Sequence, residues 1–171
     1  MYVKKSLEQF GKDLVKQTRA SLTRQGKNNT SSLYKSLDYD LNVSKNSFSF
    51  SFLAEDYLTF VDKGVKGFSS SSKAPNSPYK FGSGTGKKGG LSKGINDWVR
   101  QKRIQFKSKK GQFLSYDSTA FIIRRSVWHT GLKTTNVFTR PFELAFKRLP
   151  DDLVEAYALE IEDLLKFTTN D

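Results

Sequence analysis

Apolar residues near the start of the chain recur every three or four positions. This spacing places side chains on one face of a helix that ends near Gln25-Gly26. The residues that share this face are Val3, Leu7, Phe10, Leu14, Thr18 and Leu22. A second, short helical segment is predicted over Leu33–Leu37.

The period then changes from about 3.6 to two. Tyr39, Leu41 and Val43 alternate with polar residues, and residues 47–52 alternate strictly between Ser and Phe. Alternation of this kind predicts strands, and Ser44-Lys45-Asn46 between them predicts a turn. We therefore expect a β-hairpin with one buried aromatic face and one serine-lined face in water.

Helical spacing returns in the second half of the chain. A short helix is predicted between Glu55-Asp56 and Gly64, and a longer one from Ser92, as its N-cap, to Lys102. Residues 107–112 are predicted to form a turn, and residues 116–127 a helix that ends before Gly131.

Two further helices are predicted near the C-terminus. Arg140-Pro141 begins the first, because proline suits the first turn of a helix. Asp151-Asp152 begin the second, where acidic side chains favour the helix dipole. Its expected inner stripe consists of Leu153, Tyr157, Ile161 and Leu164.

Residues 66–94 show no period and are rich in Ser, Gly, Lys and Pro. This composition favours a flexible arm. We therefore predict one α+β domain over residues 1–171: a small antiparallel sheet, built from the β-hairpin, packed against helices. The arm over 66–94 projects from it, and an acidic helix over 150–171 ends it.

The formal charge of +12 is unevenly distributed. Residues 63–110 contain thirteen Lys or Arg and one acid, whereas the rest of the chain is balanced. The tail from Pro150 to Asp171 has seven acids and one Lys. This asymmetry points to charged partners or to self-association of unlike surfaces.

Little in the sequence favours catalysis. The chain has no Cys and one His, His129, whose place late in a predicted helix suits the helix dipole. Asp38 and Asp40 share a strand face, which more often faces water than holds a cation. We expect no enzyme activity, cofactor or metal. No secretory signal or membrane span is expected, because no apolar run is long enough.

The basic arm leaves two interpretations open. Aromatic residues interleaved with Lys can stack on bases and contact phosphates, while mobile basic arms also bind neighbouring subunits in assemblies. The candidate partner-binding residues are Lys66, Lys73, Tyr79, Lys80, Phe81, Lys87, Lys88 and Lys93.

The order of elements resembles the tail-completion or head–tail connector proteins of tailed bacteriophages. Three short motifs around the hairpin carry the resemblance. They are Ser31-Ser-Leu-Tyr-Lys-Ser-Leu37, Tyr57-Leu-Thr-Phe-Val-Asp-Lys-Gly64 and Val137-Phe-Thr-Arg-Pro-Phe-Glu-Leu-Ala145. Ser32 stands where the family usually has Gly, and Asp62 where it has Glu.

The resemblance implies a structural virion protein. Such proteins form a ring of six or twelve copies in the neck, bind portal or adjacent connector proteins and tail proteins, and let DNA pass. They are made in the host cytoplasm. They carry no catalytic residues. By this resemblance the motif residues are architectural, as buried aromatics, a glycine turn and a helix start. These residues are Tyr57, Phe60, Gly64, Arg140, Pro141 and Phe142.

Overall fold

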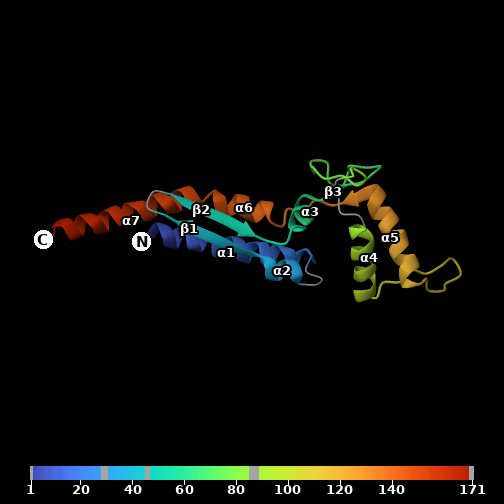
Figure 1. The fold of residues 1–171 in the computed structure, drawn as a ribbon. Helices are drawn as coiled ribbons and strands as arrows, with labels where there is room; N and C mark the ends of the chain where they lie inside the picture. Colours follow the sequence, from blue (N-terminus) through green and yellow to red (C-terminus); the bar gives the residue numbers. More distant parts are fainter. Residues whose placement is uncertain (1, 28–30, 45–46, 85–88, 170–171) are drawn as a thin grey trace. The chain divides into compact units, whose positions relative to one another are not determined.

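The computed structural model describes residues 2–27, 31–44, 47–84 and 89–169, with side chains in the last helix as far as Asp163. Helices and two small antiparallel sheets make up the chain, which confirms the predicted α+β class (Figure 1). The chain divides into two compact units, whereas the sequence pattern indicated one domain. Unit 1 comprises residues 1–58 and 136–171, and unit 2 comprises residues 59–135.

Helix α1 (Tyr2–Arg24) is the longest element of unit 1. Its predicted inner face is confirmed, since Leu7, Leu14, Thr18 and Leu22 are fully buried and Val3 nearly so. Phe10 is half-buried. The short helix α2 (Ser32–Ser36) follows and buries Leu33.

The predicted hairpin is confirmed as β1 (Asp38–Val43) paired with β2 (Phe48–Leu53). Its register sets Tyr39 opposite Phe52 and Leu41 opposite Phe50. Side chains on one face are half-buried while the serines between them are exposed, as period-two alternation requires. Phe48 at the end of the aromatic face is 45% exposed.

Helix α1 packs against the hairpin through close aromatic contacts. The Phe10 ring meets Phe50 edge-on at 5.1 Å between centroids, and Tyr39 stacks on Phe50 at 5.6 Å. Gly11 permits this approach, because a Cβ there would lie 2.6 Å from the Tyr39 ring. A helix with any larger residue at position 11 would stand farther from the hairpin.

Two C-terminal helices complete unit 1. Phe138, just before α6 (Thr139–Phe146), packs on Phe52 of β2 at 4.6 Å between ring centroids. Helix α7 (Leu149–Thr169) packs along α1, where Leu149 and Ala156 join Val3 and Leu7 in one core cluster.

The first turn of α1 contains no acidic residue of its own. A carboxylate from α7 takes that place, since Glu160 Oε1 accepts a hydrogen bond from the Val3 backbone N–H at 3.1 Å. A carboxylate at a helix N-terminus satisfies a backbone donor and favours the helix dipole. Glu160, late in α7, thus contacts Val3 at the start of α1, and the two helices run in opposite directions (Figure 1).

The predicted inner stripe of α7 is partly wrong. Leu153 is half-buried, but Tyr157 and Ile161 are 55% and 56% exposed, and Leu164 lies outside the side chains described. Ala156 is buried instead. The residues at positions 149, 153, 156 and 160 share one face, and α1 packs against that face.

Two short antiparallel strands hold unit 2 together, and we call their pairing the β3–β4 crossing. Helix α3 (Leu58–Lys63) leads through Gly64 into β3 (Val65–Lys66), which pairs with β4 (Gly131–Leu132). Gly64 and Gly131 have φ of 70° and 84°, and a Cβ on Gly131 would collide with the Val65 backbone carbonyl. Glycine therefore allows the two backbones to approach at this crossing.

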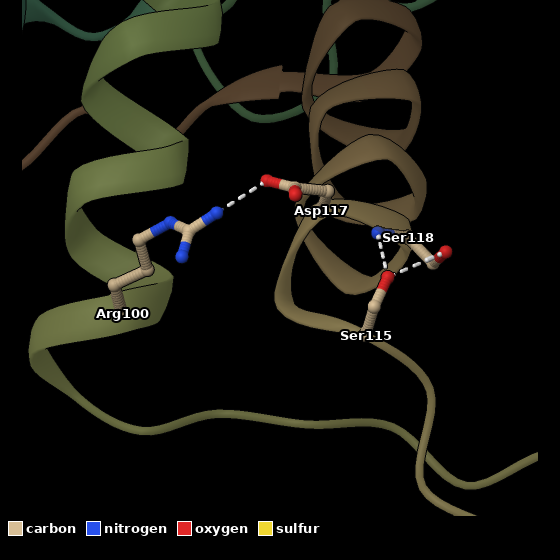
Figure 2. Close-up of polar contacts among 4 residues, drawn as sticks. All are labelled: Arg100, Ser115, Asp117 and Ser118. Atoms are coloured by element: carbon tan, nitrogen blue, oxygen red, sulfur yellow. Dashed lines mark hydrogen bonds and ion pairs between the residues drawn. The ribbon is translucent and has the colours of Figure 1, made fainter.

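Helices α4 (Gly90–Gln101) and α5 (Tyr116–Thr130) pack side by side in unit 2. Figure 2 shows Arg100 of α4 bound to Asp117 of α5 at 2.7 Å, beside the cap of α5, where Ser115 Oγ accepts from the Ser118 N–H. The predicted cap at Ser92 is wrong: α4 begins earlier, and Ser92 Oγ accepts from Arg124 Nη1 at 3.0 Å.

The prediction of a projecting arm over residues 66–94 is also wrong for the residues that the structure describes. Ala74 and Ser77 are buried, the Lys66 N–H donates to the Tyr79 carbonyl, and the Phe81 N–H donates to the Lys66 carbonyl. Residues 90–94 belong to α4. The prediction took low hydrophobicity as a sign of a flexible segment. Backbone hydrogen bonds hold this segment in place without a large apolar core.

Replacement of Gly11 by alanine tests the helix–hairpin contact. Gly11→Ala should lower the free energy of unfolding by about 1–3 kcal/mol, because the new methyl group collides with Tyr39. The helical Gly94→Ala in unit 2, with open space around it, should raise that free energy by up to about 1 kcal/mol. Urea titration followed by far-UV circular dichroism measures both changes, and equal effects of the two variants would contradict the packing described.

Loss of the Ser77 hydroxyl tests whether residues 66–84 belong to the folded unit. Ser77 Oγ donates to the Gly64 carbonyl at 2.8 Å and accepts from the Tyr79 N–H. Ser77→Ala should therefore destabilise unit 2 by about 1–3 kcal/mol. Tryptophan fluorescence reports this unit, because it contains both Trp98 and Trp128. Ser71→Ala, at an exposed position, is the control. Equal stability of the two variants would support the original prediction that these residues form a projecting arm.

Candidate functional site

Nearly all of the net charge lies in unit 2. Residues 59–135 contain sixteen basic and three acidic residues, a formal charge of +13, whereas unit 1 sums to −1. The basic middle of the sequence is thus a folded unit inserted into a nearly neutral one. A surface of this charge attracts polyanions and acidic protein segments.

The structure brings part of the predicted partner-binding set together. Lys66 is half-buried in β3, Tyr79 packs on Phe60 at 4.5 Å between centroids, and Phe81 stacks on Trp128 at 5.5 Å. Lys73 Nζ donates to Thr130 Oγ1 at 2.8 Å. These four residues therefore stabilise the β3–β4 crossing rather than a separate arm.

The other predicted residues are dispersed. Lys80 is exposed beside the crossing, and Lys93 is exposed on α4. Lys87 and Lys88 lie outside the described residues.

An aromatic cluster that sequence reasoning missed lies at the end of α5. The Phe68 ring is 6.3 Å from both Trp128, on which it stacks, and His129, which it meets edge-on. Phe68 is 55% and Trp128 38% exposed, so two aromatic rings face solvent next to the β3–β4 crossing. Phe68 directly follows Gly67, whose backbone lies against the backbone of His129. The two segments are far apart in the sequence, so no local pattern of residues predicts that they meet.

The predicted turn over residues 107–112 is confirmed and forms a basic, aromatic tip. Lys107 pairs with Phe113 in an antiparallel bridge, and the Lys107 ammonium lies 5.0 Å from the centre of that ring. Phe113 is 65% exposed, and Lys109 and Lys110 are also exposed. We call residues 107–113 the basic tip.

The motif residues divide between core and surface. Pro141 is buried at the start of α6, Phe142 and Leu33 lie within unit 1, and Gly64 makes the expected turn. Arg140 is exposed. Tyr57 and Phe60 are 39% and 41% exposed, so their prediction as buried aromatics is wrong. Tyr57 precedes the short helix α3 and Phe60 lies within it, and a helix of six residues is too short to bury both rings.

Unit 1 contains a basic groove between α1 and the start of the hairpin, with a volume of about 740 Å³. Lys12, Lys16, Arg19 and Arg24 of α1 line it, and Asp38 is the acidic residue in its wall. Arg19 fixes one side, because its guanidinium donates to the carbonyls of Tyr34 and Leu37 at 3.1 and 2.9 Å. We call this feature the α1–β1 groove.

Helix α7 presents an uncovered apolar stripe. Val154, Tyr157 and Ile161 follow one another at spacings of three and four residues and are 71%, 55% and 56% exposed. Between Pro150 and Asp163 there are six acidic residues and no basic residue. Exposed apolar surface bordered by like charges is typical of a binding face rather than of a helix in water alone.

The described residues contain no group of three or more His, Cys, Asp or Glu placed to hold a metal ion. His129 is exposed, and its Nδ1 lies 3.0 Å from Ser69 Oγ, a contact that joins residues 68–70 to the end of α5. Asp38 and Asp40 both lie on the exposed face of β1. No helix in the described part of the chain is long and apolar enough to cross a membrane.

Comparison with known proteins found no matching family model, no matching curated protein and no matching solved structure. Function is therefore argued from the surfaces just described: the basic unit 2, the α1–β1 groove and the acidic apolar stripe of α7.

Proposed function

We propose that this chain is a structural protein of a tailed-bacteriophage particle, present as a ring of identical copies in the neck. The ring joins the portal or an adjacent connector ring to the tail and leaves a channel for DNA. The supporting observation is that one chain carries unlike surfaces: basic ones on unit 2 and in the α1–β1 groove, and an acidic one on α7 with exposed apolar residues. A closed ring requires unlike surfaces of this kind, because each copy uses a different surface for each of its two neighbours.

The placement of residues from all three motifs supports the same proposal. Leu33 and Leu37 of the first motif and Val137 and Pro141 of the last are buried in unit 1, and Gly64 forms a turn with positive φ. Most of these positions serve the fold, which is what the resemblance to connector proteins implies for them.

Removal of the protein from a producing phage should uncouple heads from tails. Without a neck ring the DNA-filled head has no surface that the tail can bind, so lysates should contain separate heads and tails. Electron microscopy and infectivity measure the outcome, and expression of the wild-type chain from a plasmid should restore both. Normal infectious particles without the protein would refute the proposal.

A second candidate function is binding of nucleic acid by unit 2. The charge of +13, with the exposed Phe113 in the basic tip and Phe68 beside the β3–β4 crossing, favours contact with phosphates and bases. In a neck ring the same surface would face the DNA channel, so the two candidates are compatible.

Duplex binding should fall steeply with salt. Contact with about six phosphates predicts a slope of log K against log salt near −5. Replacement of Lys107, Lys109 and Lys110 by Gln should make the slope shallower by roughly 2–3. The same change at Lys4, Lys5 and Lys35 of unit 1 is the control. Fluorescence anisotropy measures the slope, and a flat response of the wild type would exclude this function.

A further inference from the structure

Unit 1 carries its two uncovered surfaces at opposite ends of α1. Helix α7 passes the start of α1, where Glu160 contacts Val3, and continues away from α2 (Figure 1). The α1–β1 groove lies on the second half of the same helix, from Lys12 to Arg24. Lys16 is about 20 Å along the helix axis from Val3. The end of α7 therefore points away from the groove of its own chain.

The groove is suited to an acidic segment with apolar side chains. Val15 and Leu37 in its wall are buried, and Tyr34 and Tyr39 are half-buried, so its floor is apolar. Lys12, Lys16 and Arg24 are exposed, and no ion pair among the described residues involves them. Their charges can therefore attract acids on a partner without breaking an existing pair.

Helix α7 has the complementary properties. Its apolar stripe of Val154, Tyr157 and Ile161 is exposed, and Asp151 and Glu155 follow that stripe along one side. Two α7 helices would repel one another, because each has six acids and no base from Pro150 to Asp163. Charge complementarity favours a basic partner with an apolar floor.

We infer that the α7 stripe of one copy docks into the α1–β1 groove of the next copy. The contact is head-to-tail, because groove and stripe are different surfaces at opposite ends of unit 1. Head-to-tail contacts between identical copies close into rings when the rotation between copies permits. This inference rests on the proposed ring and names the surfaces that build it.

Disulfide trapping tests the contact directly, because the chain has no Cys of its own. Ala20 lines the groove and Ala158 lies beside the stripe, and both are exposed. A disulfide needs Cα atoms within about 7 Å, which these two positions in one chain cannot reach. A mixture of the single variants A20C and A158C should therefore give cross-linked dimers. The double variant should give a ladder of cross-linked oligomers that ends at the copy number of the ring.

The control pairs A20C with S126C, an exposed position on the basic helix α5. We expect at least about tenfold slower cross-linking for this pair, since no groove–stripe contact brings it together. Equal rates for the two pairs would overturn the inference. Faster cross-linking of A158C with S126C than with A20C would also overturn it and would identify α5 as the surface that receives α7.

Charge reversal provides a second, independent readout. Lys12→Glu with Lys16→Glu should slow the A20C–A158C reaction by about fivefold or more, because both charges border the groove. Lys4→Glu with Lys5→Glu makes the same change on α1 outside the groove and should alter the rate less than twofold. Equal effects of the two pairs would contradict a groove-specific contact.

Failure of this inference and failure of the proposed function give different results. A neck ring of this chain in virions, without preferential A20C–A158C cross-linking, would overturn the docking contact and leave the ring standing. Preferential cross-linking of the purified chain, with joined heads and tails in particles lacking it, would retain the contact and overturn the neck function.

Discussion

The close approach of α1 to the hairpin is the constraint on which unit 1 depends. Gly11 lies against the Tyr39 ring, and Phe10 and Tyr39 hold Phe50 between them. With α1 in this place, its first half receives α7 and its second half forms the wall of the α1–β1 groove. One glycine thus determines how closely α1 approaches β1 and therefore where the wall of the groove lies, because a larger residue would hold the helix farther from the sheet.

Unit 2 meets a different physical requirement. It has few large buried side chains, and its backbone is held by the β3–β4 crossing, the buried Ser77 hydroxyl and the packing of α4 on α5. Such a unit tolerates sixteen basic residues because most of them are exposed and need no core. The chain can therefore concentrate positive charge here without destabilising the neutral unit that carries α1.

Local patterns predicted most elements and fewer of the contacts. Helical spacing identified α1 and α5, and strict Ser–Phe alternation identified the hairpin, because both periods follow from backbone geometry alone. The same patterns failed for residues 66–84, where glycine and serine suggested an arm. Backbone hydrogen bonds such as that from Lys66 to Tyr79 join segments without any apolar period to reveal them.

The candidate surfaces also divide into features that the sequence predicts and features that only the fold reveals. The sequence by itself determined the basic middle, the acidic end and the absence of Cys, because charge and composition do not depend on the fold. Only the tertiary structure decided that Tyr157 and Ile161 face outward while Ala156 faces α1, since periodicity shows a stripe but not which stripe is covered. It also decided that Lys12 and Lys16 border a groove, because that groove exists only once α1 lies against β1.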